Sequence, residues 1–301
     1  MIAASEYELL REGAGVVERT RGKLVLRGSE AADFLQGQVT NDVEGLAPGT
    51  GCYALLLNQK GKVRADMRIL RGADWIWIDC AKGALPVIDH MIRTYGIGRD
   101  IRPEDVTAAR TIRSVLGPAA RTTLGVDVPD EEHSFVDTGE SLYVATDQGV
   151  DVIVPTGHAL DGIEPVSADA AECLRVEAGR PRFGIDFDSD TIPQEAGLNE
   201  RGVSFSKGCY VGQETVARLH YKGKPNRHLR GLRLSAPAAR GDELRLGERV
   251  VGGVGSAAES PLHGPIALAL VRREAEPGAT VEVGTYGVTA QVVELPFRRI
   301  P

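Results

Sequence analysis

The segment from residue 227 to the C-terminus places the tightest constraint on the fold. It consists of short apolar runs separated by turns rich in glycine and proline, and no part of it has the 3.6-residue periodicity of an amphipathic helix. Six strands are predicted there, at Arg230–Leu234, Glu243–Leu246, Arg249–Gly255, Ile266–Arg272, Thr280–Val283 and Val288–Val293. Short strands joined by tight turns are typical of a small barrel, so we predict a C-terminal β-barrel domain over residues 227–301.

The preceding residues, 1–226, are predicted to form a separate α+β region. The runs CYALLL, KVRADMRIL and WIWIDC, at residues 52–57, 62–70 and 75–80, are joined by short turns and predict an antiparallel meander. Apolar residues at helical spacing predict helices over 85–95 and 167–179. The overall prediction is an α+β protein with a C-terminal barrel, and the possibility that residues 1–226 hold two similar halves stays open.

Serine residues are predicted to cap the N-termini of two helices. Ser29 follows a short strand and precedes a helix that contains Phe34 and Leu35, and Ser167 precedes the helix over 167–179. A serine hydroxyl at this position accepts a hydrogen bond from an otherwise free backbone N–H of the first turn. We therefore expect both serines to be N-caps.

Composition and charge exclude several classes of protein. The chain has 42% hydrophobic and 26% charged residues, as ordinary globular proteins do. With 35 Lys+Arg against 42 Asp+Glu its net charge is −7, the opposite of the basic surplus of a nucleic-acid binder. Its longest apolar runs are strand-sized, and its N-terminus lacks the features of a secretory signal. No nucleic-acid or membrane partner is therefore expected.

The cysteines point to a reducing compartment. They lie at positions 52, 80, 173 and 209 without a CxxC pair or regular spacing, and the six histidines form no close pair. This pattern fits neither a disulfide framework nor a zinc site. We predict a cytoplasmic protein without a bound structural metal.

The stretch FSKGCYVGQETVAR, residues 205–218, carries the strongest signal of chemistry. A helix is predicted over 213–222, ended by Gly223 in a left-handed conformation. Cys209 would then lie about one turn before the helix N-terminus with Lys207 close by, and both features favour the thiolate over the thiol. The alternative is that Cys209 is a small buried apolar residue in a turn. These residues alone leave the two interpretations equally open.

Glycines flank this cysteine on both sides. Gly208 and Gly212 are expected to allow positive φ angles and the close approach of another group. Either interpretation of Cys209 is compatible with such a turn.

The segment Lys207-Gly208-Cys209-Tyr210-Val211-Gly212-Gln213-Glu214 resembles the K-G-C-[FY]-x-G-Q-E signature of the YgfZ family of folate-binding proteins, which are relatives of the glycine-cleavage T-protein (aminomethyltransferase). Further segments resemble the same family in the same order: residues 34–43, 53–69, 174–198, 214–232 and 250–273. The resemblance covers nearly the whole chain from about residue 20. It implies a T-protein-like fold of antiparallel sheets and helices around a central cavity, followed by the β-barrel.

The resemblance also implies a function. The family binds tetrahydrofolate or a one-carbon derivative in the cavity and supports the assembly, maintenance or repair of iron–sulfur enzymes through the motif cysteine, here Cys209. Its implied partners are folate and iron–sulfur assembly proteins or client enzymes. Four scattered cysteines do not suit a stably held all-cysteine cluster, which leaves a transient cluster completed by a partner's ligands.

Glu177, in the segment LRVEAG, matches the glutamate that holds the pterin in T-protein-like folds. One carboxylate can accept two parallel N–H bonds from the N3–H and 2-amino edge of a pterin. The alternative is an ordinary exposed glutamate on a helix.

Other matched positions are expected to complete the folate site. Arg180 and Arg182 would bind the glutamate tail of the folate, since guanidinium groups suit carboxylates; the alternative is a solvated loop. The remaining cavity residues implied by the resemblance are Gln36, Thr40, Asn41, Asp42, Tyr210 and Gln213. The alternative for Asn41 and Asp42 is that they cap the end of a helix.

One position departs from the T-protein pattern. T-proteins carry two adjacent acidic residues where this chain has Ala65 followed by Asp66. The alternative function, a folate-dependent one-carbon (aminomethyl) transferase or demethylase, would use Asp66 as its base, with Cys209 and Lys207 as the other catalytic candidates. A third hypothesis is a module that binds folate without catalysis. The lost acidic residue and the cysteine motif both point away from glycine cleavage.

Overall fold

The computed structural model describes residues 3–285 and 287–298. The chain divides into two compact units, each of which is considered by itself. The sheet unit comprises Glu8–Val166 and Asn199–Thr215. The barrel unit comprises Ser167–Leu198 and the chain from Val216 onward, together with the residues that precede Glu8. The predicted division between residues 226 and 227 stays a prediction.

Two five-stranded antiparallel sheets form the sheet unit. The first has the order β3-β4-β5-β2-β6, with bounds Thr50–Leu57, Val63–Arg71, Trp75–Ala81, Arg21–Arg27 and Arg102–Asp105. The second has the order β1-β7-β10-β9-β8, with bounds Gly15–Arg19, Arg110–Leu116, Gly149–Pro155, Leu142–Thr146 and Phe135–Asp137. Strands β3, β4 and β5 are successive antiparallel neighbours, which confirms the predicted meander.

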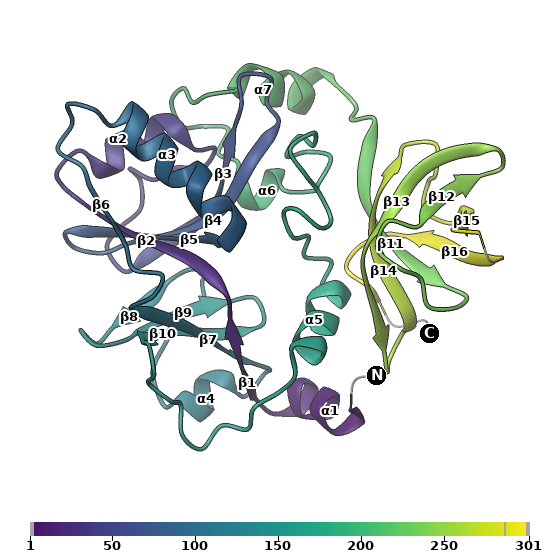
Figure 1. Cartoon of the computed structure of the whole chain (residues 1–301), viewed down its shortest axis with the longest axis horizontal. Helices are drawn as coiled ribbons and strands as arrows, with labels where there is room; N and C mark the ends of the chain where they lie inside the picture. Colours follow the sequence, from purple (N-terminus) through teal and green to yellow (C-terminus); the bar gives the residue numbers. More distant parts are fainter. Residues whose placement is uncertain (1–2, 286, 299–301) are drawn as a thin grey trace. The chain divides into compact units, whose positions relative to one another are not determined.

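Helices α2 (Ala31–Gln38) and α3 (Leu85–Tyr95) pack on the outer face of the first sheet (Figure 1). Their buried residues, among them Phe34, Leu35 and Ile88, share one apolar core with β2, β3, β4 and β5. Burial of such side chains is the main stabilising contribution to a unit of this kind. The short helices η1 (Lys82–Ala84), α4 (Ala120–Leu124) and α6 (Asn199–Gly202) complete the unit.

The predicted N-cap Ser29 is wrong. The N-cap of α2 is Glu30, which makes no side-chain capping bond. The Ser29 hydroxyl instead donates to Asp100 at 3.0 Å. Asp100 lies 71 residues further along the chain. Its carboxylate thus accepts the hydroxyl hydrogen bond of Ser29, which the local sequence pattern had predicted to cap the helix.

An ion-pair network is buried between the two sheets. Arg68 on β4 donates to Asp79 on β5 at 2.7 Å and to Asp151 on β10 at 2.6 Å. Burial by itself raises the pKa of Asp79, but the guanidinium groups of Arg68 and Arg21 lower it to about 2. Because a buried charge is costly unless it is paired, this network fixes how strands of the two sheets are joined.

The barrel unit contains the closed six-stranded barrel expected from the sequence. Its order is β11-β14-β13-β12-β15-β16, with bounds Arg227–Leu234, Gly264–Arg272, Arg249–Ser260, Glu243–Leu246, Thr280–Val283 and Val288–Val293. Small apolar residues such as Val251, Ala267 and Ala269 fill its core. All six strands overlap the predicted ranges, and this confirms the barrel.

Helix α5 (Ala168–Glu177) packs against β13 and β14 of the barrel. The Ser167 hydroxyl accepts a hydrogen bond from the Ala170 N–H at 3.2 Å, so this predicted N-cap is confirmed. Two more helices, α1 (Ala4–Glu12) and α7 (Gln213–Lys222), each contribute residues to both units. None of the helices in residues 3–285 and 287–298 is both long and apolar enough to cross a membrane.

The end of α7 differs from the prediction in one respect. Gly223 does not adopt a positive φ angle. Its N–H donates to the Leu219 carbonyl at 3.1 Å, the ordinary helical bond, and α7 ends one residue earlier, at Lys222. A left-handed stop at Gly223 is therefore wrong, although the helix bounds are as expected.

Candidate functional site

Cys209 is the one exposed cysteine of the four in the chain. It lies four residues before the first residue of α7. The other three cysteines are buried, and burial raises the pKa of each of their thiols to about 12. They are consequently protonated at neutral pH. The structure excludes the interpretation of Cys209 as a buried apolar residue and leaves it as the accessible thiol of the described chain.

Gly212 is the glycine that this turn requires. It has φ +86, and a Cβ atom there would lie 2.5 Å from the Asn58 carbonyl oxygen in the β3–β4 turn. A positive φ for Gly212 is confirmed, whereas for Gly208 it is wrong. Gly208 has open space around its α-carbon, so neither conformation nor packing demands a glycine there.

Lys207 is held at the C-terminal end of α2. Its ammonium group donates to the carbonyl oxygens of Gln36, Val39 and Asn41 at 2.6, 2.7 and 2.9 Å. These three acceptors match the three donors of an ammonium group. Burial lowers the pKa of Lys207 to about 8 despite the nearby Asp42 carboxylate, which acts in the opposite direction. Any effect of Lys207 on Cys209 stays a prediction.

The expected cavity residues on and after α2 make hydrogen bonds within the sheet unit. Thr40 is fully buried, donates to the Gly202 carbonyl and accepts from the Leu55 N–H at 2.9 Å. Asn41 donates to the Tyr53 carbonyl at 2.8 Å. Gln36 accepts from the Val43 N–H at 2.8 Å and donates to Asp42. These side chains shape the segment that also receives Lys207, and their role toward folate stays a prediction.

Tyr210 and Gln213 continue the cysteine segment. The Tyr210 ring is buried and lies 5.3 Å from the Lys207 ammonium nitrogen, in a cation–π arrangement. Burial raises the pKa of its hydroxyl to about 12. Gln213 begins α7, and its N–H donates to the Tyr210 carbonyl at 3.3 Å.

Asp66 is a buried carboxylate on β4 with one tyrosine donor. The Tyr53 hydroxyl donates to its Oδ2 at 2.8 Å, and both side chains are at least nine-tenths buried. Burial and the neighbouring Asp66 charge raise the pKa of Tyr53 well above its usual value. Arg201 lies over the Tyr53 ring at 4.9 Å and is ion-paired with Glu132. A carboxylate fixed in this way is suited to accept a proton or orient a polar ligand.

Sequence reasoning missed Tyr53, although a signal was present. The strand register pairs Leu55 with Asp66 and Tyr53 with Arg68. Alternate residues of neighbouring strands share a face of the sheet, so Tyr53 and Asp66 are diagonal neighbours once the meander is predicted.

His133 is a second residue without a counterpart in the predictions. It has φ +72, is 7% exposed, and neither ring nitrogen has a hydrogen-bond partner among the described residues. Burial lowers its pKa to about 4, although Glu132, 3.8 Å away, acts in the opposite direction. The local sequence EEHS gives no signal of this, because the burial comes from distant strands.

Glu177, the last residue of α5, is 8% exposed. Its Oε1 accepts from the hydroxyls of Tyr7, at 2.8 Å, and Ser260, and from the Cys173 thiol at 3.5 Å. In residues 3–285 and 287–298, every side-chain hydrogen bond to the Glu177 carboxylate is accepted by Oε1, and no cationic side chain forms an ion pair with it. The alternative of an exposed glutamate is therefore wrong. Tyr7 and Ser260 were not predicted, since they lie 170 and 83 residues away in sequence.

The arginines that follow α5 are arranged differently from each other. Arg182 pairs with Glu172 at 2.6 Å, and its side chain is 42% exposed. The Arg180 carbonyl accepts a hydrogen bond from Arg175. A role for Arg180 and Arg182 in binding a folate tail stays a prediction.

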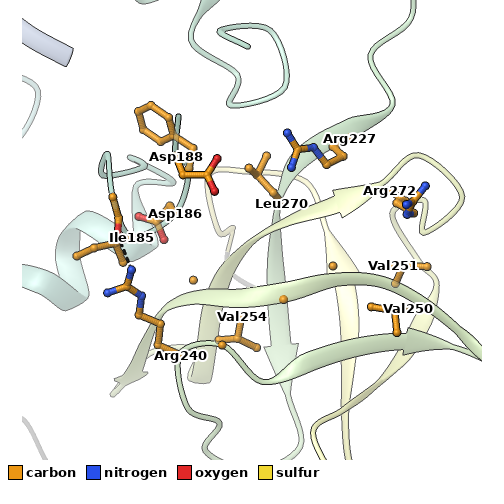
Figure 2. Close-up of a pocket in the computed structure, with 16 residues that line it drawn as sticks. Ile185, Asp186, Asp188, Arg227, Arg240, Val250, Val251, Val254, Leu270 and Arg272 are labelled. Carbon is orange, nitrogen blue, oxygen red and sulfur yellow. Dashed lines mark hydrogen bonds between the residues drawn. The ribbon is translucent and has the colours of Figure 1, made fainter. Parts of the chain in front are cut away.

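An open pocket of about 540 Å³ lies on the barrel unit between β13 and the loop at 184–188 (Figure 2). Three arginines line it, and two of them have partners: Arg240 donates to the Gly184 carbonyl, and Arg227 pairs with Glu195 at 2.8 Å. The buried Asp186 accepts bonds from Arg175, Arg182 and Ser256. Asp186 and Arg240 thus hold the loop to the barrel.

The described residues contain no group of three or more histidine, cysteine, aspartate or glutamate side chains arranged to hold a metal ion. The candidate residues form two sets, each within one unit. In the sheet unit they are Cys209, Lys207, the segment after α2 and the Asp66–Tyr53 pair. In the barrel unit they are Glu177 and its hydroxyl donors.

Comparison with known families decides the relationship. Residues 1–154 match the GCVT N-terminal domain, and residues 227–298 match the glycine cleavage T-protein C-terminal barrel domain. The chain belongs to the glycine cleavage T-protein family. The predicted relationship to T-proteins and YgfZ is thereby confirmed, and so is the predicted fold class.

Individual relatives cover nearly the whole chain. An aminomethyltransferase of Synechococcus sp. (strain RCC307) is 31% identical over 98% of this chain and 90% of its own length. The tRNA-modifying protein YgfZ of Escherichia coli (strain K12 / DH10B) is 27% identical over 90% of this chain and 89% of its own. The crystal structure of aminomethyltransferase T from Bartonella henselae superimposes with a TM-score of 0.87 at 22% identity, covering 97% of this chain and 88% of that one.

Proposed function

We propose that this T-protein family member is a cytoplasmic protein that binds tetrahydrofolate or a one-carbon derivative and uses the Cys209 thiol in the assembly, maintenance or repair of iron–sulfur enzymes. Glu177 carries the folate assignment. A buried carboxylate is costly without a cationic partner, and among the described residues this one has hydroxyl and thiol donors on Oε1 alone. The N–H groups of a pterin edge are donors of the kind that Oε2 can accept.

Isothermal titration with tetrahydrofolate tests this assignment. Glu177→Gln keeps the shape of the side chain but removes its charge, so we expect the dissociation constant to rise roughly tenfold or more. Glu259→Gln is the matched control, because Glu259 is an exposed glutamate on β13 next to Ser260. Equal affinities of the wild type and Glu177→Gln would contradict the proposed pterin site.

The role of Cys209 is supported by its exposure in an otherwise buried set of cysteines. In a deletion strain, Cys209→Ser is expected to fail to restore the activity of iron–sulfur enzymes that the wild-type chain restores. Ser206→Ala, a neighbouring exposed position, is expected to restore it fully. Full complementation by Cys209→Ser would remove the thiol from the mechanism, whether or not folate binds.

The Asp66–Tyr53 pair supports a second candidate function, a folate-dependent one-carbon transferase. A buried carboxylate oriented by a hydroxyl at 2.8 Å can serve as a base. Incubation with tetrahydrofolate and an aminomethyl donor would then give methylene-tetrahydrofolate, and Asp66→Asn would abolish turnover while the exposed Asp74→Asn would not. Absence of turnover in the wild type would leave the accessory function as the better proposal.

A further inference from the structure

A separate cavity of about 370 Å³ lies in the sheet unit, away from every residue assigned above. Its wall is formed by the end of β2, the first residues of α2, the β4–β5 turn and the start of β6. Three arginines, Arg27, Arg71 and Arg102, and one carboxylate, Asp74, line it. We call it the Arg71 pocket. Three guanidinium groups against one carboxylate give it a positive balance.

Arg71 has one buried guanidinium nitrogen without an acceptor. Its Nη1 atom is buried and has no hydrogen-bond partner among the residues that the structure describes. In that part of the chain no carboxylate forms an ion pair with Arg71. A buried guanidinium N–H left without an acceptor costs free energy, and native proteins leave few such donors unsatisfied. Arg71 also lines the pocket, so an anion there would lie beside a guanidinium group that no carboxylate of the described residues neutralises.

The other two arginines are available to the same anion. Arg27 on β2 and Arg102 on β6 are directly paired in the strand register. Their carboxylate partners lie at 3.5 Å (Asp74) and 3.7 Å (Asp100), in pairs whose side chains are all at least about half exposed. Exposed pairs with such separations contribute little to stability, so their arginines can turn toward a ligand at small cost.

The first turn of α2 forms part of the pocket wall. Ala31 and Ala32 line it, and the N-cap Glu30 makes no side-chain capping bond. The Glu30 carboxylate instead accepts from the Asp100 N–H at 2.6 Å. The pocket therefore lies beside the N-terminal end of α2, where the helix dipole favours an anion and the carboxylates of Glu30 and Asp33 act in the opposite direction.

We propose that the Arg71 pocket binds the dianionic phosphate group of a small phosphate monoester. Planar guanidinium groups form paired hydrogen bonds with phosphate oxygens. Trp75 and Ile76 also line the pocket and offer an apolar wall to the carbon part of an ester, which free phosphate would not use. The pocket of Figure 2 offers fewer unpaired cations, because two of its three arginines, Arg227 and Arg240, are already bonded within the protein.

Isothermal titration at constant ionic strength tests the pocket with inorganic phosphate, phenyl phosphate and acetate. Phenyl phosphate is expected to bind more tightly than inorganic phosphate, and acetate more weakly than both. Arg71→Gln is expected to weaken binding of phenyl phosphate about tenfold, the effect of one lost charge-assisted bond pair. The control Arg249→Gln, on an exposed arginine of β13, is expected to leave it unchanged.

Three results would overturn the proposal: no saturable binding of either phosphate up to about 10 mM, unchanged affinity in Arg71→Gln, or acetate binding as tight as phosphate. Tighter binding of inorganic phosphate than of phenyl phosphate would overturn the ester assignment. Should Arg71→Gln fail to fold by circular dichroism, Arg102→Gln replaces it, because that side chain is 75% exposed. Tetrahydrofolate titration of the same variants is expected to match the wild type, so failure here is distinct from failure of the folate site.

Discussion

Glu177, His133 and Arg68 are buried side chains with bonding capacity that the described chain does not use. Glu177 has its recorded bonds on one oxygen, both ring nitrogens of His133 lack a partner, and so does Nη2 of Arg68. Such groups cost stability, and in natural proteins they gather at functional sites. A polar ligand or an ordered water would find an unused bonding group at each of them.

The burial of His133 leads to a prediction of how the stability of the fold depends on pH. In the unfolded chain its pKa is near 6.5, and burial lowers it to about 4 in the folded protein. Above pH 6.5 the ring is neutral in both states. Between pH 6.5 and 4 only the unfolded chain binds the proton, so stability falls by up to about 3 kcal/mol as pH decreases through this window.

His133→Asn is expected to remove this loss, because asparagine does not titrate and tolerates a positive φ angle. The measurement is the free energy of unfolding in urea at about pH 7 and pH 4.5. Relative to the wild type, the variant should become more stable at the lower pH. An equal decrease in both proteins would show that His133 is not the titrating group.

At the scale of elements, Lys207 caps the C-terminal end of α2, although it lies about 170 residues further along the chain. Helix C-termini leave carbonyl groups without intrahelical partners, and here one ammonium group satisfies carbonyls at and just after the helix end. A motif lysine expected beside the thiol thus also stabilises the segment predicted to line the cavity.

Lys207→Met is expected to lower the free energy of unfolding by about 2 kcal/mol, because it leaves buried carbonyl groups without donors. Lys224→Met, at an exposed position after α7, serves as the control and should change stability little. Urea unfolding of the two variants at neutral pH measures the difference. Equal stabilities would mean that water replaces the ammonium group at the end of α2.

Element positions were predictable because their signals are local. The helices over Leu85–Tyr95 and Gln213–Lys222 and three of the six barrel strands have the bounds that periodicity and turn residues indicated. Partners of side chains were not predictable, because they depend on chain segments brought together by folding. The Ser29 hydroxyl donates to Asp100, and the Tyr7 hydroxyl donates to Glu177, which lies 170 residues away in sequence.

At the scale of the whole molecule, the net charge of −7 constrains the choice of partner. One relative at 27% identity is a tRNA-modifying protein, and direct contact with RNA would require a basic surface. In this chain 42 acidic residues oppose 35 basic ones, and the arginines of the two pockets lie in different units. A small phosphate ester fits the Arg71 pocket of about 370 Å³, whereas a polyanion needs an extended surface.

We therefore predict that the full chain does not retain tRNA at about 0.15 M salt, with a dissociation constant no tighter than about 10⁻⁴ M. Fluorescence anisotropy of labelled tRNA, measured at two salt concentrations, checks this. Counterion release makes electrostatic binding fall steeply as salt rises, so weak binding that vanishes at the higher salt agrees with the prediction. Micromolar binding at about 0.15 M salt would contradict it, and loss of that binding in Arg71→Gln would show that the Arg71 pocket holds an RNA phosphate.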